Sequence, residues 1–378
     1  MHDPRLDQLA HLLVNYSTGV KKDDLVVITG STVAEPAIAA VFQAVLAAGG
    51  HPWVKMTSDH CKELHLKYGS PAQLRHVSPF EKHMMGKCQA FIAFWGEENT
   101  RALSNVKPAH QALLSQGRKP ILNMFLKRAG KPKRDPDRVN WVGTQFPTQS
   151  AAQDAEMSRA EYADFVFNAC KLNQPHPVAV WKKFAVAQQR LCDLLNKGRE
   201  MRLRAPGGTD LRLGIQGRRW LNCAGHENMP DGEVFTGPRE DATEGTVHFT
   251  YPAVMGSREV VDVRLTFKAG KVVDASAAKN EEFLIKMLDQ DRGGRTLGEL
   301  ALGCNYGVKR FTRNTLFDEK IGGTFHLAVG AAFPETGGRN ESGLHWDMVC
   351  DLRKGGTVEV DGKVISRSGK FTNPAWPH

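Results

Sequence analysis

The sequence lacks the short motifs that mark several large enzyme classes. Its 378 residues contain no GxSxG elbow, no HExxH pair and no Walker GxxxxGK[ST] loop. A serine hydrolase needs the first motif to expose its nucleophile, a zincin needs the second to bind zinc, and a P-loop enzyme needs the third to hold phosphates. No GxGxxG follows the first predicted strand, so the sequence does not indicate a dinucleotide site.

Long apolar runs and paired cysteines are also missing. No stretch of about 18 apolar residues occurs, so no membrane span is expected. The seven cysteines are odd in number, scattered and free of any CxxC, which argues against a disulfide framework or a zinc ribbon. The N-terminal segment carries charges throughout and resembles an amphipathic helix rather than a signal peptide, so we expect a cytoplasmic protein.

The composition is that of a globular protein, with 41% hydrophobic and 24% charged residues. The chain is too long for one ordinary domain, and we predict two, at residues 1–178 and 179–378. Much of the net charge of +9 comes from short runs such as residues 127–138, which lack interleaved aromatic residues. We interpret these runs as solvated loops and expect no nucleic-acid partner.

The first domain alternates strand and helix patterns. Strands are predicted at residues 25–30, 52–56, 88–96 and 120–125, and helices at 4–19, 35–48, 71–87 and 104–116. Strand–helix–strand units in series indicate a parallel sheet, and strands that are apolar on both faces belong to the middle of a helix-covered sheet. The pattern predicts an open α/β, Rossmann-like scaffold domain.

The second domain has a different pattern. Helical segments at residues 151–172 and 177–200 connect it to the first. Further along, apolar and polar residues alternate between tight turns at 203–222, 247–254, 260–277 and 357–371, and one helical segment at about 280–303 interrupts them. This pattern predicts an α+β domain with a curved, mostly antiparallel sheet.

Residues 322–347 hold His326, His345 and Asp347 among glycines and strand-forming apolar residues. His345 and Asp347 are two residues apart, and alternate side chains of a strand share a face, so both point into one space. A single histidine in a strand is usually a hydrogen-bonded core or surface residue. Two histidines with a carboxylate, however, suit a metal ion that keeps open coordination positions.

Two glutamates enlarge this candidate set. Glu233, in NMPDGEVFTGP, lies at a strand start between turns, and Glu299, in LGELALG, is predicted in an apolar helical turn, where a charge should be paired or bound to metal. Three carboxylates and two imidazoles exceed the needs of one ion but satisfy two divalent ions about 3.5 Å apart. Glu319 is a candidate to orient a ligand histidine through its second nitrogen, or it forms a surface ion pair with Lys320.

Over most of its length, and most strongly over residues 220–371, the chain resembles the M29 metallopeptidases of the aminopeptidase T group. The motifs that carry the resemblance are NMPDGEVFTGP, EGTVHF, LGELALG, NTLFDEKIGGTFHLAVG, PETGGRNESGLHWDMV and VDGKVI. The resemblance implies a metal-bearing C-terminal domain, a homodimer and the removal of N-terminal residues from short peptides. It also implies two divalent ions (zinc, cobalt or manganese) bound by Glu233, Glu299, His326, His345 and Asp347.

The sequence departs from the family at Phe333, because the family carries a tyrosine near or on the metals. Phenylalanine keeps the ring but can neither ligate nor donate a proton. Two alternatives therefore stay open. One is a catalytically impaired relative that still binds metal. The other is a non-haem iron dioxygenase that opens a dihydroxypyridine ring, with His326, His345 and Asp347 as its two histidines and one carboxylate.

For the peptidase, a carboxylate near the ions is expected to act as general base and to return the proton to the leaving amine. Glu335, in FPETGG, is our candidate for this role, although the same residue also fits an ordinary turn glutamate.

Overall fold

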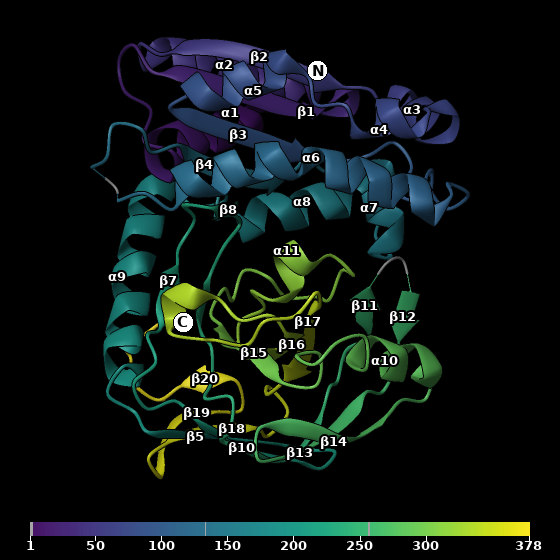
Figure 1. The fold of residues 1–378 in the computed structure, drawn as a ribbon. Coiled ribbons are helices and arrows are strands. Elements are labelled where there is room, and N and C mark those ends of the chain that lie inside the picture. Colours follow the sequence, from purple (N-terminus) through teal and green to yellow (C-terminus); the bar gives the residue numbers. More distant parts are fainter. Residues whose placement is uncertain (1–2, 133, 256–257) are drawn as a thin grey trace. The chain divides into compact units, whose positions relative to one another are not determined.

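The computed structural model describes residues 3–132, 134–255 and 258–378 (Figure 1). The chain divides into two compact units. Unit 1 holds the described residues up to Val178 together with Gly225–Pro230, and unit 2 holds Ala179–Ala224 and Asp231–His378. A short segment of the second half of the sequence thus belongs to the first unit.

Unit 1 is built on a five-stranded parallel sheet, as the alternating sequence pattern predicts. The strands in spatial order are β2 (His51–Thr57), β1 (Leu25–Ser31), β3 (Ala90–Trp95), β4 (Asn140–Gln145) and β8 (Asn228–Met229). The short strand β8 comes from the returning segment and closes one edge of the sheet beside β4.

Helices cover both faces of this sheet (Figure 1). On one face, Val27 of β1 packs in a core with Met85 and Ile121. On the other face, Gly30 of β1 lies close to Ile38 of α2. The helical elements of unit 1 are α1 (Pro4–Leu12), the π-helical turn η1 (Leu13–Ser17), the 3-10 turn η2 (Thr32–Ala34), α2 (Glu35–Ala47), α3 (Asp59–Tyr68), α4 (Pro71–Arg75), α5 (Pro79–Lys87), α6 (Pro108–Ala129), α7 (Gln149–Asp154) and α8 (Arg159–Ala169).

Several helix starts are set by local sequence. Ser70 before α4 and Ser158 before α8 each form a capping box, in which the serine oxygen accepts the backbone N–H of the third helical residue. The side chain of that residue, Gln73 or Glu161, accepts the backbone N–H of the serine in return. These reciprocal bonds satisfy helix-end donors that would otherwise be unpaired.

Two predictions for unit 1 are wrong in detail. The predicted strand at residues 120–125 lies inside α6, where Ile121 is buried while Leu122 is half exposed. A short apolar run fits a strand or one stripe of a helix equally well, and periodicity alone does not separate them. The single helix predicted at residues 71–87 is two helices, α4 and α5, and Pro79 begins the second.

Unit 2 contains two large antiparallel sheets and one small one. The eight-stranded sheet has the order β14 (Lys271–Ser276), β13 (Arg264–Lys268), β10 (Thr243–His248), β6 (Thr209–Gly214), β5 (Glu200–Ala205), β18 (Thr357–Val360), β19 (Lys363–Arg367) and β20 (Lys370–Phe371). The five-stranded sheet has the order β17 (His345–Asp351), β16 (Thr324–Gly330), β15 (Leu297–Gly303), β9 (Glu233–Thr236) and β7 (Leu221–Cys223). β11 (Ala253–Met255) pairs with β12 (Arg258–Val260).

The helical elements of unit 2 are few: α9 (Pro177–Leu195), which begins at the last residues of unit 1, α10 (Glu281–Leu288), α11 (Thr315–Asp318) and the 3-10 turn η3 (Pro334–Thr336). The mostly antiparallel architecture agrees with the alternating sequence pattern. No helix in the described part of the chain is long and apolar enough to cross a membrane.

The helix predicted at about residues 280–303 is wrong in its second half. α10 ends at Leu288, and residues 297–303 form strand β15. Every residue of β15 and of its neighbour β16 is buried. A strand that is buried on both faces loses the alternation that would identify it, so LGELALG imitates a helix. Glu299 therefore lies in a central strand and not in a helical turn.

Leu327→Ala tests the packing of this central sheet. Leu327 is 1% exposed and projects from β16 on the side opposite to His326. Its truncation is expected to lower the free energy of unfolding by about 2–5 kcal/mol, because the cavity does not fully collapse. The measurement is the urea unfolding transition. Val273→Ala, on an exposed position of β14, is the matched control and should change stability by less than about 1 kcal/mol. Equal effects of the two substitutions would contradict the packing.

Candidate metal centre

The register of the five-stranded sheet brings the predicted residues to one face. Directly paired residues of antiparallel strands project to the same side. Glu299 of β15 pairs with Ala328 of β16, and Ala328 pairs with Asp347 of β17. His326 and His345 are each two residues from a member of this row, so they share its face.

Glu233 joins the same face from β9, because it pairs with Gly303, which lies four residues after Glu299 along β15. The other positions on this face between the charged residues are small: Ala301, Gly303 and Ala328. Small side chains leave room above the sheet for long polar ones. Four adjacent strands thus bring the five residues that the sequence singles out to one face of the sheet.

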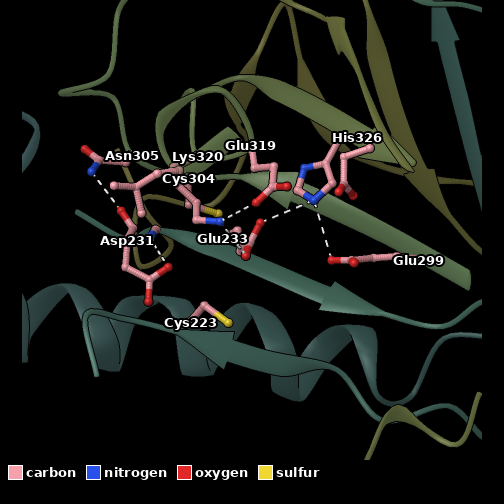
Figure 2. A network of polar contacts seen from close by, with 12 residues as sticks. Cys223, Asp231, Glu233, Glu299, Cys304, Asn305, Glu319, Lys320 and His326 are labelled. Carbon is pink, nitrogen blue, oxygen red and sulfur yellow. Dashed lines mark hydrogen bonds and ion pairs between the residues drawn. The ribbon is translucent and has the colours of Figure 1, made fainter. Parts of the chain in front are cut away.

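The ligating atoms of these residues form two groups that share Glu299. The His326 group consists of Glu233, Glu299 and His326, and the His345 group consists of Glu299, His345 and Asp347. In each group the candidate ligand atoms lie within 4.8 Å of one another. His326 Nε2 is 3.3 Å from Glu233 Oε2 and 3.5 Å from Glu299 Oε1 (Figure 2).

Glu299 turns one oxygen toward each group. Its Oε1 faces His326, whereas its Oε2 lies 3.2 Å from His345 Nε2. His345 Nε2 is also 3.6 Å from Asp347 Oδ1. The other ring nitrogen of His345, Nδ1, lies 2.9 Å from the carbonyl oxygen of Ala331, which fixes the ring with Nε2 toward the carboxylates. A carboxylate in this position can bridge two cations.

Several buried atoms in these groups have no hydrogen-bond partner among the described residues. They are Glu233 Oε2, both ring nitrogens of His326 and Asp347 Oδ1. His326 is fully buried, and Glu233 and Glu299 are nearly so. Buried polar atoms are almost always paired, so unpaired atoms that face one another indicate a missing partner. Imidazole nitrogens and carboxylate oxygens are donors that zinc and related divalent ions accept, and the residues therefore fit such ions.

The charges in the cluster depend strongly on one another. Burial alone would raise the pKa of Glu299, but contacts with His326 and His345 outweigh it and hold the pKa at about 2. Burial alone would lower the pKa of each histidine, but the contacts with Glu299 and other carboxylates raise both to about 9. Burial, with the neighbouring glutamates, raises the pKa of Asp347 well above its usual range. These shifts favour an ionised Glu299 between two protonated histidines, so the site favours positive charge next to this carboxylate.

Lys320 is a charged neighbour of the cluster that the sequence analysis did not identify. It lies between α11 and β16 with only 1% of its side chain exposed, so it is not half of a surface ion pair with Glu319. Its Nζ donates to Glu233 Oε1 at 2.9 Å and to Glu319 Oε2 at 2.7 Å (Figure 2). The sequence contained one signal that could have identified Lys320 as part of the site. Its charge stands one residue before the buried, apolar Ile321 and six residues before His326.

Glu319 also approaches the cluster. An oxygen of Glu319 lies within 4.8 Å of ligand atoms of His326 and Asp347. A further group, of Cys223, Asp231 and Glu233, lies on the other side of Glu233. Figure 2 shows the carboxylates of Glu233 and Glu319 between the amino group of Lys320 and the ring of His326.

Phe333 lies beside the His345 group. Its ring meets the ring of His345 edge to face, with centroids 5.1 Å apart, and meets Phe235 in the same way at 5.3 Å. The side chain keeps 39% of its surface exposed. The residue that departs from the family pattern therefore contacts a candidate ligand directly.

Glu335, the predicted general base, occupies an exposed position in η3, two residues after Phe333. Within the described parts of the chain, it does not belong to any of the groups whose atoms could hold an ion. The structure thus brings together the five predicted ligands and leaves Glu335 on the adjoining loop.

Several proteins that are similar to this chain are named aminopeptidases. Aminopeptidase AmpS of Bacillus subtilis (strain 168) is 28% identical over 98% of both chains. Aminopeptidase 2 of Geobacillus stearothermophilus is 32% identical over 62% of this chain, and the match spans about two thirds (66%) of that relative's length.

Two solved structures share the fold. AmpT from Thermus thermophilus superposes with a TM-score of 0.83 at 23% identity and covers 98% of this chain and 99% of its own. 2,5-Dihydroxypyridine dioxygenase from Pseudomonas putida KT2440 superposes with a TM-score of 0.62 at 13% identity, over 98% and 97% of the two chains. At these identities the likeness concerns the fold alone.

The family model for thermophilic metalloproteases (M29) matches residues 2–371, which is nearly the whole chain. This match confirms the resemblance that the motifs around Glu233, Glu299, His326 and His345 carry. The protein belongs to the M29 family of metalloproteases.

Proposed function

We propose that the protein is a metal-dependent aminopeptidase that removes N-terminal residues from short peptides. The observation that carries the proposal is the position of Glu299, whose two oxygens face two separate groups of ligand atoms. Such an arrangement suits a pair of divalent ions bridged by one carboxylate. Curated relatives in the same family are named aminopeptidases, which supports the substrate class.

In this proposal Glu233 and His326 would hold one ion, His345 and Asp347 would hold the other, and Glu299 would contribute to both. Zinc, cobalt and manganese all accept such nitrogen and oxygen donors. A bound pair of such ions lowers the pKa of water and polarises the peptide carbonyl. Burial of Glu233, Glu299 and His326 keeps bulk water away from the charges and so strengthens their interactions.

The protein must also move a proton. We assign the general base to Glu335, which would accept a proton from the attacking water and return it to the leaving amine. The support is its place on the loop that carries Phe333, whose ring packs on His345, and its exposure, which leaves its carboxylate free to meet a substrate.

Phe333 is expected to limit the rate. It stands where the family carries a tyrosine, and a phenyl ring offers no hydrogen bond to the oxygen that becomes negative during attack. Loss of one such donor typically costs about 3–4 kcal/mol of transition-state stabilisation. The protein should therefore be a slow peptidase, with metal binding intact.

The ring-opening dioxygenase is the second candidate, because a dioxygenase shares the fold. A single iron would need only His326, His345 and one carboxylate. That reading leaves Glu233 and Glu299 buried in the same cluster without a role. The shared family with aminopeptidases and the two complete groups favour the two-ion peptidase.

We further infer a cytoplasmic homodimer. This inference rests on the family resemblance and on the odd number and scattered positions of the seven cysteines in the sequence, which suit a reducing compartment.

Removal of metal tests the proposal directly. Protein treated with a chelator should lose hydrolysis of unblocked aminoacyl substrates and regain it with zinc, cobalt or manganese, because both ion positions must be filled. Elemental analysis of the reloaded protein should give two ions per chain. One iron per chain together with oxygen uptake on a dihydroxypyridine would instead establish the dioxygenase.

Two glutamate-to-glutamine substitutions distinguish the role of a metal ligand from the role of the general base. Glu299→Gln should abolish binding of both ions, because a neutral amide cannot bridge two cations. Glu335→Gln should leave two ions bound and lower kcat by about 10²- to 10⁴-fold, the usual contribution of a general base. Glu341→Gln, an exposed position on the same loop, is the matched control and should change neither quantity. A Glu335→Gln enzyme with unchanged kcat would remove Glu335 from the mechanism.

Phe333→Tyr should raise kcat by about 10²- to 10³-fold, because it restores a hydrogen-bond donor beside His345. Phe80→Tyr, at a position 83% exposed in unit 1, should have no effect. Steady-state kinetics on one aminoacyl substrate measure both variants. A change confined to KM would show that the hydroxyl binds the ground state and does not assist the transition state.

A further inference from the structure

Lys320 is an unusual residue to find beside a metal centre. Its side chain is 1% exposed, and its Nζ donates to Glu233 Oε1 at 2.9 Å and to Glu319 Oε2 at 2.7 Å. Its backbone is also fixed, since its N–H donates to the carbonyl of Phe317 and its own carbonyl accepts the N–H of Asn305. A buried ammonium is costly unless it is paired, and here two carboxylates pair with it.

The ammonium bonds to one oxygen of each glutamate. Lys320 donates to Glu233 Oε1, whereas Glu233 Oε2 lies 3.3 Å from His326 Nε2 (Figure 2). Oε2 is therefore the oxygen that Glu233 turns toward the ring of His326. Glu319 is oriented in a similar way, because its Oε2 is bonded to the ammonium.

The charge of Lys320 falls on one side of the cluster. Beyond the shared Glu299, the His326 group is surrounded by two glutamates, Glu233 and Glu319, and Lys320 offsets one of their charges. The negative charge of Asp231 reaches the ammonium as well. His345 itself contacts Asp347, the Ala331 carbonyl and the ring of Phe333. Lys320 reaches the His345 group through Glu319, an oxygen of which lies within 4.8 Å of a ligand atom of Asp347.

We propose that Lys320 is a positioning residue that tunes one of the two ion positions. Its ammonium is bonded to Glu233 Oε1, and its positive charge lowers the affinity of the His326 group for a divalent ion more than that of the His345 group, which it reaches through Glu319. Glu233, Glu299 and His326 would then hold a divalent ion with moderate affinity. This inference rests on the two-ion site of the proposed function.

The test uses the full-length, metal-free protein and titrates it with Zn²⁺ against a chromophoric chelator. His345→Ala leaves the His326 group as the only complete group, and His326→Ala leaves the His345 group. Lys320→Met is introduced into each background. Lys363→Met, at an exposed lysine on β19, is the matched control.

In the His345→Ala background, Lys320→Met is expected to tighten Zn²⁺ binding about tenfold or more, because a positive charge close to the ion is removed. In the His326→Ala background the same substitution should have a clearly smaller effect, because Lys320 donates to Glu233 and reaches Asp347 only through Glu319. Lys320→Arg, which keeps the charge, should stay near the parent in both. Lys363→Met should alter neither affinity.

A failure of the proposed role of Lys320 can be distinguished from a failure of the two-ion site. Equal effects of Lys320→Met in the two backgrounds, or none, would overturn the role of Lys320 while the two-ion site stands. A wild-type protein that binds no divalent ion would overturn the proposed function itself. If Lys320→Met does not fold, because it leaves two buried carboxylates unpaired, Lys320→Gln replaces it. Glutamine removes the charge but keeps an N–H donor, and the same gain in affinity is expected.

Discussion

The register of one antiparallel sheet decides what this protein can do. The pairings Glu299–Ala328–Asp347 and Glu233–Gly303 set the side chains of four strands on one face, and a slip of one residue in any strand would turn its ligand into the opposite, apolar layer. The alternation also supplies the packing that holds the register, because Leu300, Leu327 and Met348 project to the other side and are buried. The core and the metal centre are thus two faces of the same strands.

Such a concentration of buried carboxylates cannot persist without compensating positive charge. Within the chain the compensation comes from His326, His345 and Lys320, which contact Glu233, Glu299, Glu319 and Asp347. The histidines can exchange a proton for a metal ion, whereas Lys320 is a permanent cation. The difference explains why the two groups of ligand atoms are not equivalent even though they share Glu299. A residue that neither binds metal nor touches substrate can therefore still set the properties of the site.

The comparison structures show how little the fold itself specifies. AmpT and a protein named as a dioxygenase both superpose on nearly the entire chain. Function must then reside in the side chains placed on the common framework. In this chain Glu233 and Glu299 add two carboxylates to the face that holds His326, His345 and Asp347, which supports the two-ion site proposed above. The ring of Phe333 meets His345 edge to face, so a substitution there acts on a side chain that contacts a candidate ligand.

The sequence by itself determined the parallel α/β first half, the antiparallel second half, the family, and a set of five residues that the structure brings together. The family is confirmed and the mixed α/β architecture agrees with the prediction, because both use local information: strand alternation, the order of elements and intact motifs. The role of the five residues as ligands stays a prediction, although the sheet brings their side chains together. Tertiary structure alone decided that residues 120–125 are helix and that Glu299 lies in a strand, since a short apolar run has no periodicity that separates the two. It alone decided how Glu299 divides its oxygens and that Lys320 is buried, because contacts across 87 residues of chain, as between Lys320 and Glu233, leave no trace in local spacing.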